Sequence, residues 1–241
     1  MVKVCIIQID NRLTLDYLLL SQQVNKKVCE KFNYNYNFFD MNNKYTNHHS
    51  IVKKIYFIND FINTNTEYDV IVFLDSDAWV QNGYNLNTII DYLMNNDKKI
   101  GCYSRDPFLV RNTYINSGAF ILKINDESRK MYRDIITLIN NNPKFITNYF
   151  PFYDQPAISY YIYNNKEKFL IFNIEILNTP IGTVLRHNWH KNKLMFDDLH
   201  KTLELLDNNY EILNTKFIIE DNLDTNEFPN KEDLEDYSYL K

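Results

Sequence analysis

Short apolar runs alternate with amphipathic segments along the first 140 residues, and this alternation constrains the fold more than any other feature of the sequence. Runs rich in β-branched residues predict strands, and apolar residues at helical spacing predict helices. Expected strands cover residues 4–9, 36–39, 69–74, 99–103 and 119–122, and expected helices cover residues 14–32, 51–62, 86–94 and 128–139. Elements of these lengths in this order favour an α/β fold, with a mostly parallel sheet and helices on both of its faces.

The domain organisation expected from the sequence is simple. With 241 residues the chain is long enough for one α/β domain with a full core, and no internal repeat or Pro- or Gly-rich linker divides it. Beyond about Leu213 the charge becomes acidic, which is typical of a peripheral helix or a tail. We therefore expect one domain over residues 1–200 and a helical or acidic tail over residues 201–241.

Composition excludes several classes of protein. The formal net charge is −5 and no Lys- or Arg-rich stripe is present, so we expect no nucleic-acid partner. Three widely spaced cysteines without a C-x-x-C pair predict neither a disulfide framework nor a zinc site. The apolar run at the N-terminus is too short for a signal peptide or a membrane span. These features favour a reduced, cytoplasmic protein. The AT-rich codons of its abundant Asn, Ile, Lys and Tyr would suit a virus, protist or bacterium, and a viral protein would act in the host cytoplasm.

Two carboxylates, Asp75 and Asp77, directly follow the clearest apolar run of the chain, residues 69–74. In an open parallel sheet, ligands bind beyond the carboxyl ends of the strands. Hard divalent ions prefer oxygen ligands and usually complete their shell with substrate phosphates. The pair therefore indicates a Mn²⁺ or Mg²⁺ site that could neutralise a diphosphate leaving group. The alternative is that both aspartates cap the turn that follows the strand.

Further motifs follow this pair along the chain. The order of motifs resembles the retaining galactosyl- and xylosyltransferase family of fungal α-galactosyltransferases and plant xyloglucan xylosyltransferases, and more distantly the glycogenin-type family. The resemblance spans roughly residues 29–191. It rests on Lys54, which stands 75 − 54 = 21 positions before Asp75, on FLDSDA at 73–78, INSGAF at 115–120, DQPA at 154–157, and His187. One departure is that the family has a glycine after its metal histidine, where this chain has Asn188.

The resemblance implies a GT-A (Rossmann-like) fold and a metal-dependent glycosyltransferase. It would move a hexose or pentose from a nucleoside diphosphate sugar, expected to be UDP-linked, to a glycan or other hydroxyl acceptor with retention of configuration. Its metal, Mn²⁺ or Mg²⁺, would be held by Asp75, Asp77 and His187. The donor would be bound by Lys54, Asp75, Ser76, Asn116, Gly118 and Lys191, and the reacting carbon would lie near Asp154 and Gln155.

Each of these residues also has a plainer interpretation. His187 is preferred to His190 as the metal ligand on the family order alone, because composition cannot rank two histidines three residues apart. Gly118 either permits close approach of a sugar or relieves crowding at a strand start. Asp154 could assist the reacting sugar or cap a helix. The aromatic stretch 149–153 before it could face an acceptor sugar or belong to the core.

Two other functions stay open at this point. A haloacid-dehalogenase-type phosphatase also places D-x-D after an apolar strand, but that class usually opens the chain with this strand. It also has Thr or Val two positions beyond the second aspartate, where this chain has Trp79. A non-catalytic protein that binds nucleotide sugars or carbohydrates is the second alternative, because intact ligands do not prove turnover.

Overall fold

The computed structural model describes residues 2–42, 44–45, 50–106, 115–141, 154–208 and 217–225. In chain order its strands and helices are β1 (Val4–Asp10), α1 (Asp16–Phe32), β2 (Asn35–Asp40), α2 (Ser50–Thr64), β3 (Val70–Leu74), β4 (Ala78–Val80), α3 (Gly83–Met94), β5 (Gly101–Arg105), β6 (Ile115–Lys123), α4 (Asp126–Asn141), α5 (Gln155–Tyr163), β7 (Phe169–Phe172), β8 (Leu177–Thr179), β9 (Leu185–His187) and α6 (Lys193–Asp207). Two 3₁₀ turns lie at Lys166–Lys168 and Glu220–Asn222. Every strand and helix expected from the sequence is confirmed, with ends that differ by a few residues. The aromatic stretch 149–153 lies outside the described residues.

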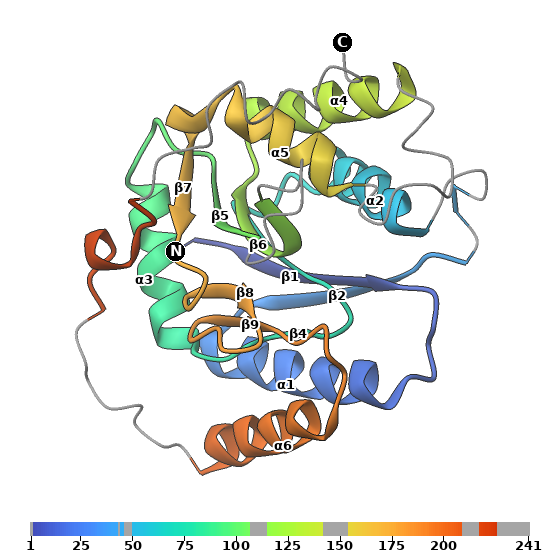
Figure 1. Ribbon diagram of the computed structural model, residues 1–241, viewed down its shortest axis with the longest axis vertical. Coiled ribbons are helices and arrows are strands. Elements are labelled where there is room, and N and C mark those ends of the chain that lie inside the picture. The colour runs from blue at the N-terminus through green and yellow to red at the C-terminus, as the bar shows by residue number, and fades with distance from the viewer. Residues whose placement is uncertain are drawn as a thin grey trace.

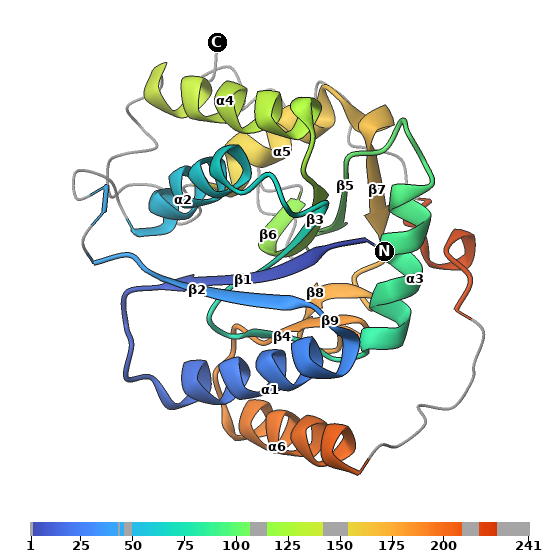
Figure 2. The ribbon, with the colours of Figure 1, turned by 180° about the vertical axis from the view of Figure 1, so that it is seen from behind.

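The central sheet has six strands in the order β2-β1-β3-β6-β5-β7. Helices α2, α4 and α5 cover one face, and α1 and α3 cover the other, with α6 packed outside α1 (Figures 1 and 2). Strand β6 runs antiparallel to both neighbours, and the other pairs in this sheet are parallel. A parallel pairing of β5 with β6 would need a crossover of a dozen or more residues, but only residues 106–114 separate the two strands. Strand β6 therefore pairs antiparallel with β5. The predicted α/β fold with a mostly parallel sheet is thus confirmed.

Strands β1 and β3 are neighbouring interior strands of this sheet and are buried along their whole length. Ile7 and Phe73 pack toward α2 and α4, whereas Ile6 and Val72 pack toward α1 and α3. A strand buried on both faces has apolar residues at successive positions, which is the pattern that marked both strands in the sequence. In the described part of the chain, no helix is both long and apolar enough to cross a membrane.

A second, smaller sheet has the order β4-β9-β8, and the sequence did not predict it. Strand β4 begins directly after Asp77 and pairs antiparallel with β9, with Ala78 opposite His187. Each of these strands has three residues, too few for a recognisable alternation of apolar and polar positions. This sheet brings together two segments that lie more than a hundred positions apart in the sequence.

Buried polar side chains hold the turn between β3 and β4 from beneath. Gln8 on β1 donates to the carbonyl of Asp75 (3.1 Å), and the Ser21 hydroxyl on α1 donates to the carbonyl of Ser76 (2.9 Å). Asn25 on α1 donates to the carbonyl of Ala78 (3.3 Å) and accepts from the amide of Val80 (3.0 Å). Because buried backbone groups must find partners, these bonds fix the direction of the turn.

A second turn, after β1, is organised by Asp10. Its carboxylate accepts from the backbone amides of Asn11 and Arg12 (both 2.7 Å) and from the Arg12 guanidinium (2.7 and 3.0 Å). Arg12 also donates to the Ser76 hydroxyl (3.3 Å), which joins the two turns. Burial alone raises the pKa of the Asp10 carboxyl. The hydrogen bonds from Arg12 and Ser76 outweigh this effect and hold the pKa below its ordinary value of 3.8.

We predict that Asp10→Asn lowers the free energy of unfolding by about 1–2 kcal/mol at pH 7, because charge-assisted hydrogen bonds to a buried carboxylate are lost. The expected loss is modest because the other partner, Arg12, is half exposed and solvent weakens the ion pair. A carboxyl whose pKa is depressed on folding stabilises the protein above its unfolded-state pKa and ceases to do so as the pH falls. The difference from the parent should therefore be full at pH 7 and shrink below about pH 4. Urea unfolding at several pH values measures it. Asp207→Asn, which breaks an exposed ion pair with Lys27, is the control and should match the parent.

Candidate functional site

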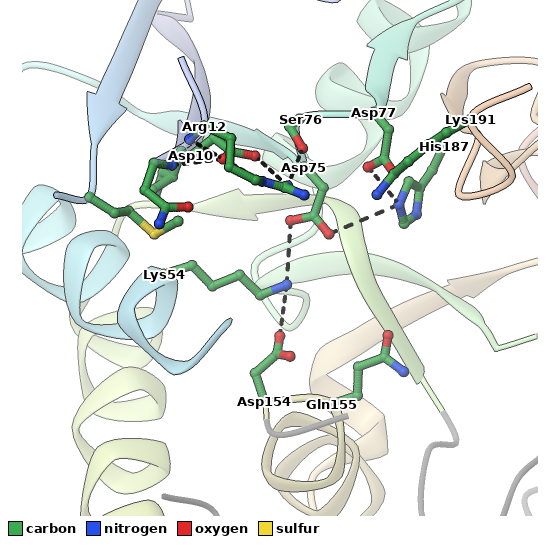
Figure 3. A pocket seen from close by; sticks show the side chains of 13 residues that line it. Asp10, Arg12, Lys54, Asp75, Ser76, Asp77, Asp154, Gln155, His187 and Lys191 are labelled. Carbon is green, nitrogen blue, oxygen red and sulfur yellow. Dashed lines mark hydrogen bonds and ion pairs between the residues drawn. The ribbon is translucent and has the colours of Figure 1, made fainter. Parts of the chain in front are cut away.

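A cavity of about 470 Å³ opens at the carboxyl ends of β1 and β3. Figure 3 shows that its walls come from both turns described above, from α2, from the start of α5, and from β9 and the loop after it. It is lined by Ile9, Asp10, Asn11, Arg12, Met41, Lys54, Asp75, Ser76, Asp77, Asp154, Gln155, His187 and Lys191. Of the residues that the sequence singled out for the site, Asn116 and Gly118 lie behind this wall, and the others line it.

Asp75, Asp77 and His187 form a compact group of possible metal ligands, with one ligand atom from each within 4.8 Å of the others. The His187 Nε2 atom lies 3.2 Å from an Asp77 oxygen and 4.0 Å from an Asp75 oxygen. Two carboxylates and an imidazole are donors that divalent ions such as Mn²⁺ accept, with open positions left for phosphate oxygens. The residues present therefore fit a divalent metal, and they do not fix its identity.

His187 reaches this position through the second sheet. The pairing of β4 with β9 sets His187 opposite Ala78, and the Asn188 amide donates to the carbonyl of Asp77 (2.9 Å). Gly118 on β6 makes room for the ring, because a Cβ there would lie 2.2 Å from the His187 Cε1 atom. His190 is exposed and lies outside the group of three. The structure thus brings His187, rather than His190, to the aspartates.

Positive groups balance the two carboxylates. Lys191 Nζ lies 3.3 Å from Asp77 Oδ2. Burial alone raises the pKa of Asp77, but His187 and Lys191 outweigh it and hold that pKa well below its usual range. Burial alone lowers the pKa of His187, and the carboxylates of Asp77 and Asp75 reverse this and raise it. For Asp75 burial dominates, and its pKa is raised. These positive groups thus offset much of the negative charge of the two aspartates.

Lys54 connects the group of Asp75, Asp77 and His187 to Asp154. This buried lysine on α2 places its Nζ 2.8 Å from Asp154 and 3.4 Å from Asp75 (Figure 3). The same Nζ lies 3.2 Å from the Ser117 hydroxyl. Burial lowers the pKa of Lys54, but Asp154 and Asp75 outweigh it, so the ammonium stays charged. The fixed interval between Lys54 and Asp75 in the sequence thus corresponds to a direct contact. A contact between Lys54 and a donor stays a proposal.

Asp154 and Gln155 stand at the start of α5. Asp154 occupies the N-cap position, but its side chain makes no capping hydrogen bond. It binds Lys54 and accepts from the Ser117 hydroxyl (2.5 Å), so the capping interpretation is not supported. Gln155 accepts from the Ser117 amide (3.4 Å) and donates to Asp106 (3.1 Å). These bonds orient both side chains at the cavity wall.

Several residues of the site escaped the sequence analysis. Asp10 and Arg12 follow a predicted strand, so the rule that ligands bind at the carboxyl ends of strands could have found them. Ser117 lies inside a motif that was noticed for its neighbours. Asp106 and Asn178 had no local signal, because each acts through partners that are distant in the sequence.

Comparisons with known proteins give a fold and no sequence family. No family model matches the chain, and no curated protein matches it. Among solved structures, a glycosyltransferase involved in the glycosylation of the major capsid of PBCV-1 aligns with a TM-score of 0.63 at 12% identity, over 84% of this chain and 99% of that one.

Two other solved structures are similar. The glycosyltransferase GlyE of Streptococcus pneumoniae aligns with a TM-score of 0.55 at 12% identity, over 87% of this chain and 63% of that one. The galactosyltransferase LgtC, solved with donor and acceptor sugar analogues, aligns with a TM-score of 0.50 at 15% identity, over 85% and 95% of the two chains. At such identities the likeness shows a shared fold alone. The expected GT-A (Rossmann-like) α/β architecture is confirmed.

Proposed function

We propose that this protein is a metal-dependent glycosyltransferase that uses a nucleoside diphosphate sugar. The observation that carries the proposal is the convergence of Asp75, Asp77 and His187 on one point of a polar cavity, within a fold shared with glycosyltransferases. The group lies beyond the carboxyl ends of the central strands, where α/β folds bind their ligands. The Lys54–Asp154 pair in the same cavity adds a second functional region next to the metal ligands.

In this proposal Asp75, Asp77 and His187 hold Mn²⁺ or Mg²⁺. The bound metal would neutralise the negative charge that develops on the diphosphate leaving group. Lys191 lies beside Asp77 and is partly exposed, so it can turn toward phosphate oxygens as a point charge. Arg12 is half exposed at the same cavity and adds a second cation near the phosphates.

Asp154 and Gln155 face the reacting carbon of the donor sugar in this proposal. Transfer with retention passes through a transition state with positive charge on the sugar ring, which a fixed carboxylate and a carbonyl oxygen stabilise. Lys54 and Ser117 fix the direction of Asp154 through the bonds described above. Asn116 and Gly118 would then support the sugar-binding side from behind the wall.

The donor and acceptor are the finer parts of the proposal. We propose a UDP-linked hexose or pentose as donor, a glycan or glycoconjugate as acceptor, and a cytoplasmic location. Calorimetric screening of UDP- and GDP-sugars with Mn²⁺, followed by assays of donor hydrolysis and transfer, tests the activity and identifies the nucleotide. The phosphatase alternative is not favoured, because the similar solved structures are glycosyltransferases. A non-catalytic binding protein would bind UDP with Mn²⁺ yet show neither hydrolysis nor transfer.

The first prediction from this proposed function concerns the metal. Asp77→Asn should weaken Mn²⁺ binding in the presence of UDP by more than the roughly 10–100-fold that loss of an outer-shell partner costs, because a charged ligand is removed. Titration calorimetry with Mn²⁺ and UDP measures this, with thermal unfolding as a check on the fold. Asp126→Asn, an exposed position on α4, is the control. Parental binding by the Asp77 variant would mean that the aspartate pair only shapes a turn.

The second prediction ranks the two histidines. His187→Ala should weaken Mn²⁺ binding in the presence of UDP severalfold or more, because the imidazole ligand is lost. His190→Ala should bind as the parent does, because His190 is exposed and lies outside the ligand group. The same titration compares the two variants side by side. A larger loss for His190→Ala would move the ligand three positions along the loop and contradict the geometry.

The third prediction concerns the chemical step. Asp154→Asn should lower kcat by about 10²-fold or more and change the donor KM little, because the lost charge matters mainly in the transition state. Asn keeps an oxygen that can accept from Lys54 and Ser117, so the wall should stay in place. Kinetics of donor hydrolysis measure both constants. Turnover close to that of the parent would remove Asp154 from the mechanism.

A further inference from the structure

Asn178 has an unusual place in the second sheet. It is fully buried, and it lies on β8 where the register with β9 shifts between Leu177 and Thr179. Its φ is 68°, in the left-handed region that few residues other than Gly and Asn adopt. A bulge with a left-handed residue re-aims a side chain, and such features are concentrated next to functional sites. Here the bulge turns the Asn178 amide toward His187.

The hydrogen bonds around Asn178 form a chain whose donors and acceptors follow from a single backbone amide. The Gly118 N–H can only donate, so the Asn116 side-chain atom that it contacts at 3.0 Å is the carbonyl oxygen. The Asn178 side-chain atom that faces this oxygen (2.7 Å) and the Asn116 backbone carbonyl (2.8 Å) must be the NH₂ group. The Asn178 carbonyl oxygen therefore points to the His187 ring.

This orientation decides which His187 nitrogen faces the metal ligands. The Asn178 oxygen lies 2.8 Å from His187 Nδ1 and can only accept, so Nδ1 must carry a proton. Nε2, which lies 3.2 Å from Asp77, is then the nitrogen that a metal can bind, in place of the proton that Nε2 shares with Asp77 when no metal is bound. A histidine that ligates a metal generally needs such a partner on its other nitrogen, which fixes the tautomer and the ring orientation.

We propose that Asn178 is the positioning residue of His187, and that it presents Nε2 to the metal through the hydrogen bond to Nδ1. The proposal rests on the metal site of the proposed function. A positioning residue differs from a merely structural one, because Asn178 affects metal binding only through the imidazole of His187. Asn suits this position in two ways, since its amide supplies both a donor and an acceptor and its backbone tolerates positive φ.

The same network continues to the other side of the cavity. The Asn116 NH₂ group donates to Asp106 (3.2 Å), and Gln155 donates to the same carboxylate oxygen (3.1 Å). Asp106 and Asn116 are buried, so these bonds form out of contact with most solvent and are strengthened accordingly. Hydrogen bonds therefore connect His187 through Asn178, Asn116 and Asp106 to Gln155. This chain holds His187 at a constant distance from Gln155.

A double-mutant cycle on Mn²⁺ binding in the presence of UDP tests this proposal. Asn178→Gly removes the amide without backbone strain, and it should weaken Mn²⁺ binding by about 10–100-fold, the usual effect of losing an outer-shell partner. In the His187→Ala background the same substitution should cause no further loss, because its effect passes through the ring. Asn33→Gly is the matched control: Asn33 also has positive φ (56°) but lies at the end of α1, and this variant should bind as the parent does.

Asn178→Asp is a second variant, which keeps an acceptor for Nδ1 but loses the donor to the two Asn116 oxygens, so it should recover part of the lost affinity. It also carries the test if the Gly variant does not fold by circular dichroism. Parental Mn²⁺ binding by Asn178→Gly, losses that add to those of His187→Ala, or an Asp variant no better than Gly would each overturn the proposal. If the parent itself binds no Mn²⁺ with UDP, the proposed metal site fails instead, and this outcome is distinguishable from the others.

Discussion

The turn from Asp75 to Ala78 is the constraint on which the site depends. Its carbonyls point into the protein, where they would cost free energy if they were left without partners. Gln8, Ser21 and Asn25 supply those partners from β1 and α1. With the backbone fixed from beneath, the two aspartates project into the cavity, and β4 starts in the direction that pairs it with β9.

Charge is the second constraint. Two aspartates at one point repel each other, and partial burial makes the repulsion stronger than it would be in water. The chain places His187, Lys191 and Lys54 around them, so the cluster is balanced in the folded protein. In the proposed function, a divalent cation replaces the contacts that His187 and Lys191 make with Asp77.

The buried amides form a layer behind the charges. Asn116, Asn178 and Gln155 each use both ends of the amide group, and a backbone N–H fixes which end is which for Asn116 and Gln155. A fully satisfied polar network is rigid, because any rotation would leave a buried donor facing a donor. Gly118 also helps to position His187, because the ring of His187 occupies the space that a side chain at position 118 would fill.

The sequence by itself determined the α/β class, and it determined the strands and helices of the first 141 residues apart from β4, because burial on one or both faces leaves a periodic pattern. It also located the aspartate pair, Lys54, Asp154 and Gln155, since each lies at a recognisable place beside a strand or within a motif. The family order favoured His187 over His190, but only the tertiary structure showed that His187 lies beside the aspartates, that Gly118 makes room for its ring and that Asn178 is its partner. These depend on the pairing of β4 with β9 and on a bulge in β8, which join residues a hundred positions apart. Three-residue strands carry no periodic signal, and a hydrogen bond between distant side chains leaves no trace in the local sequence.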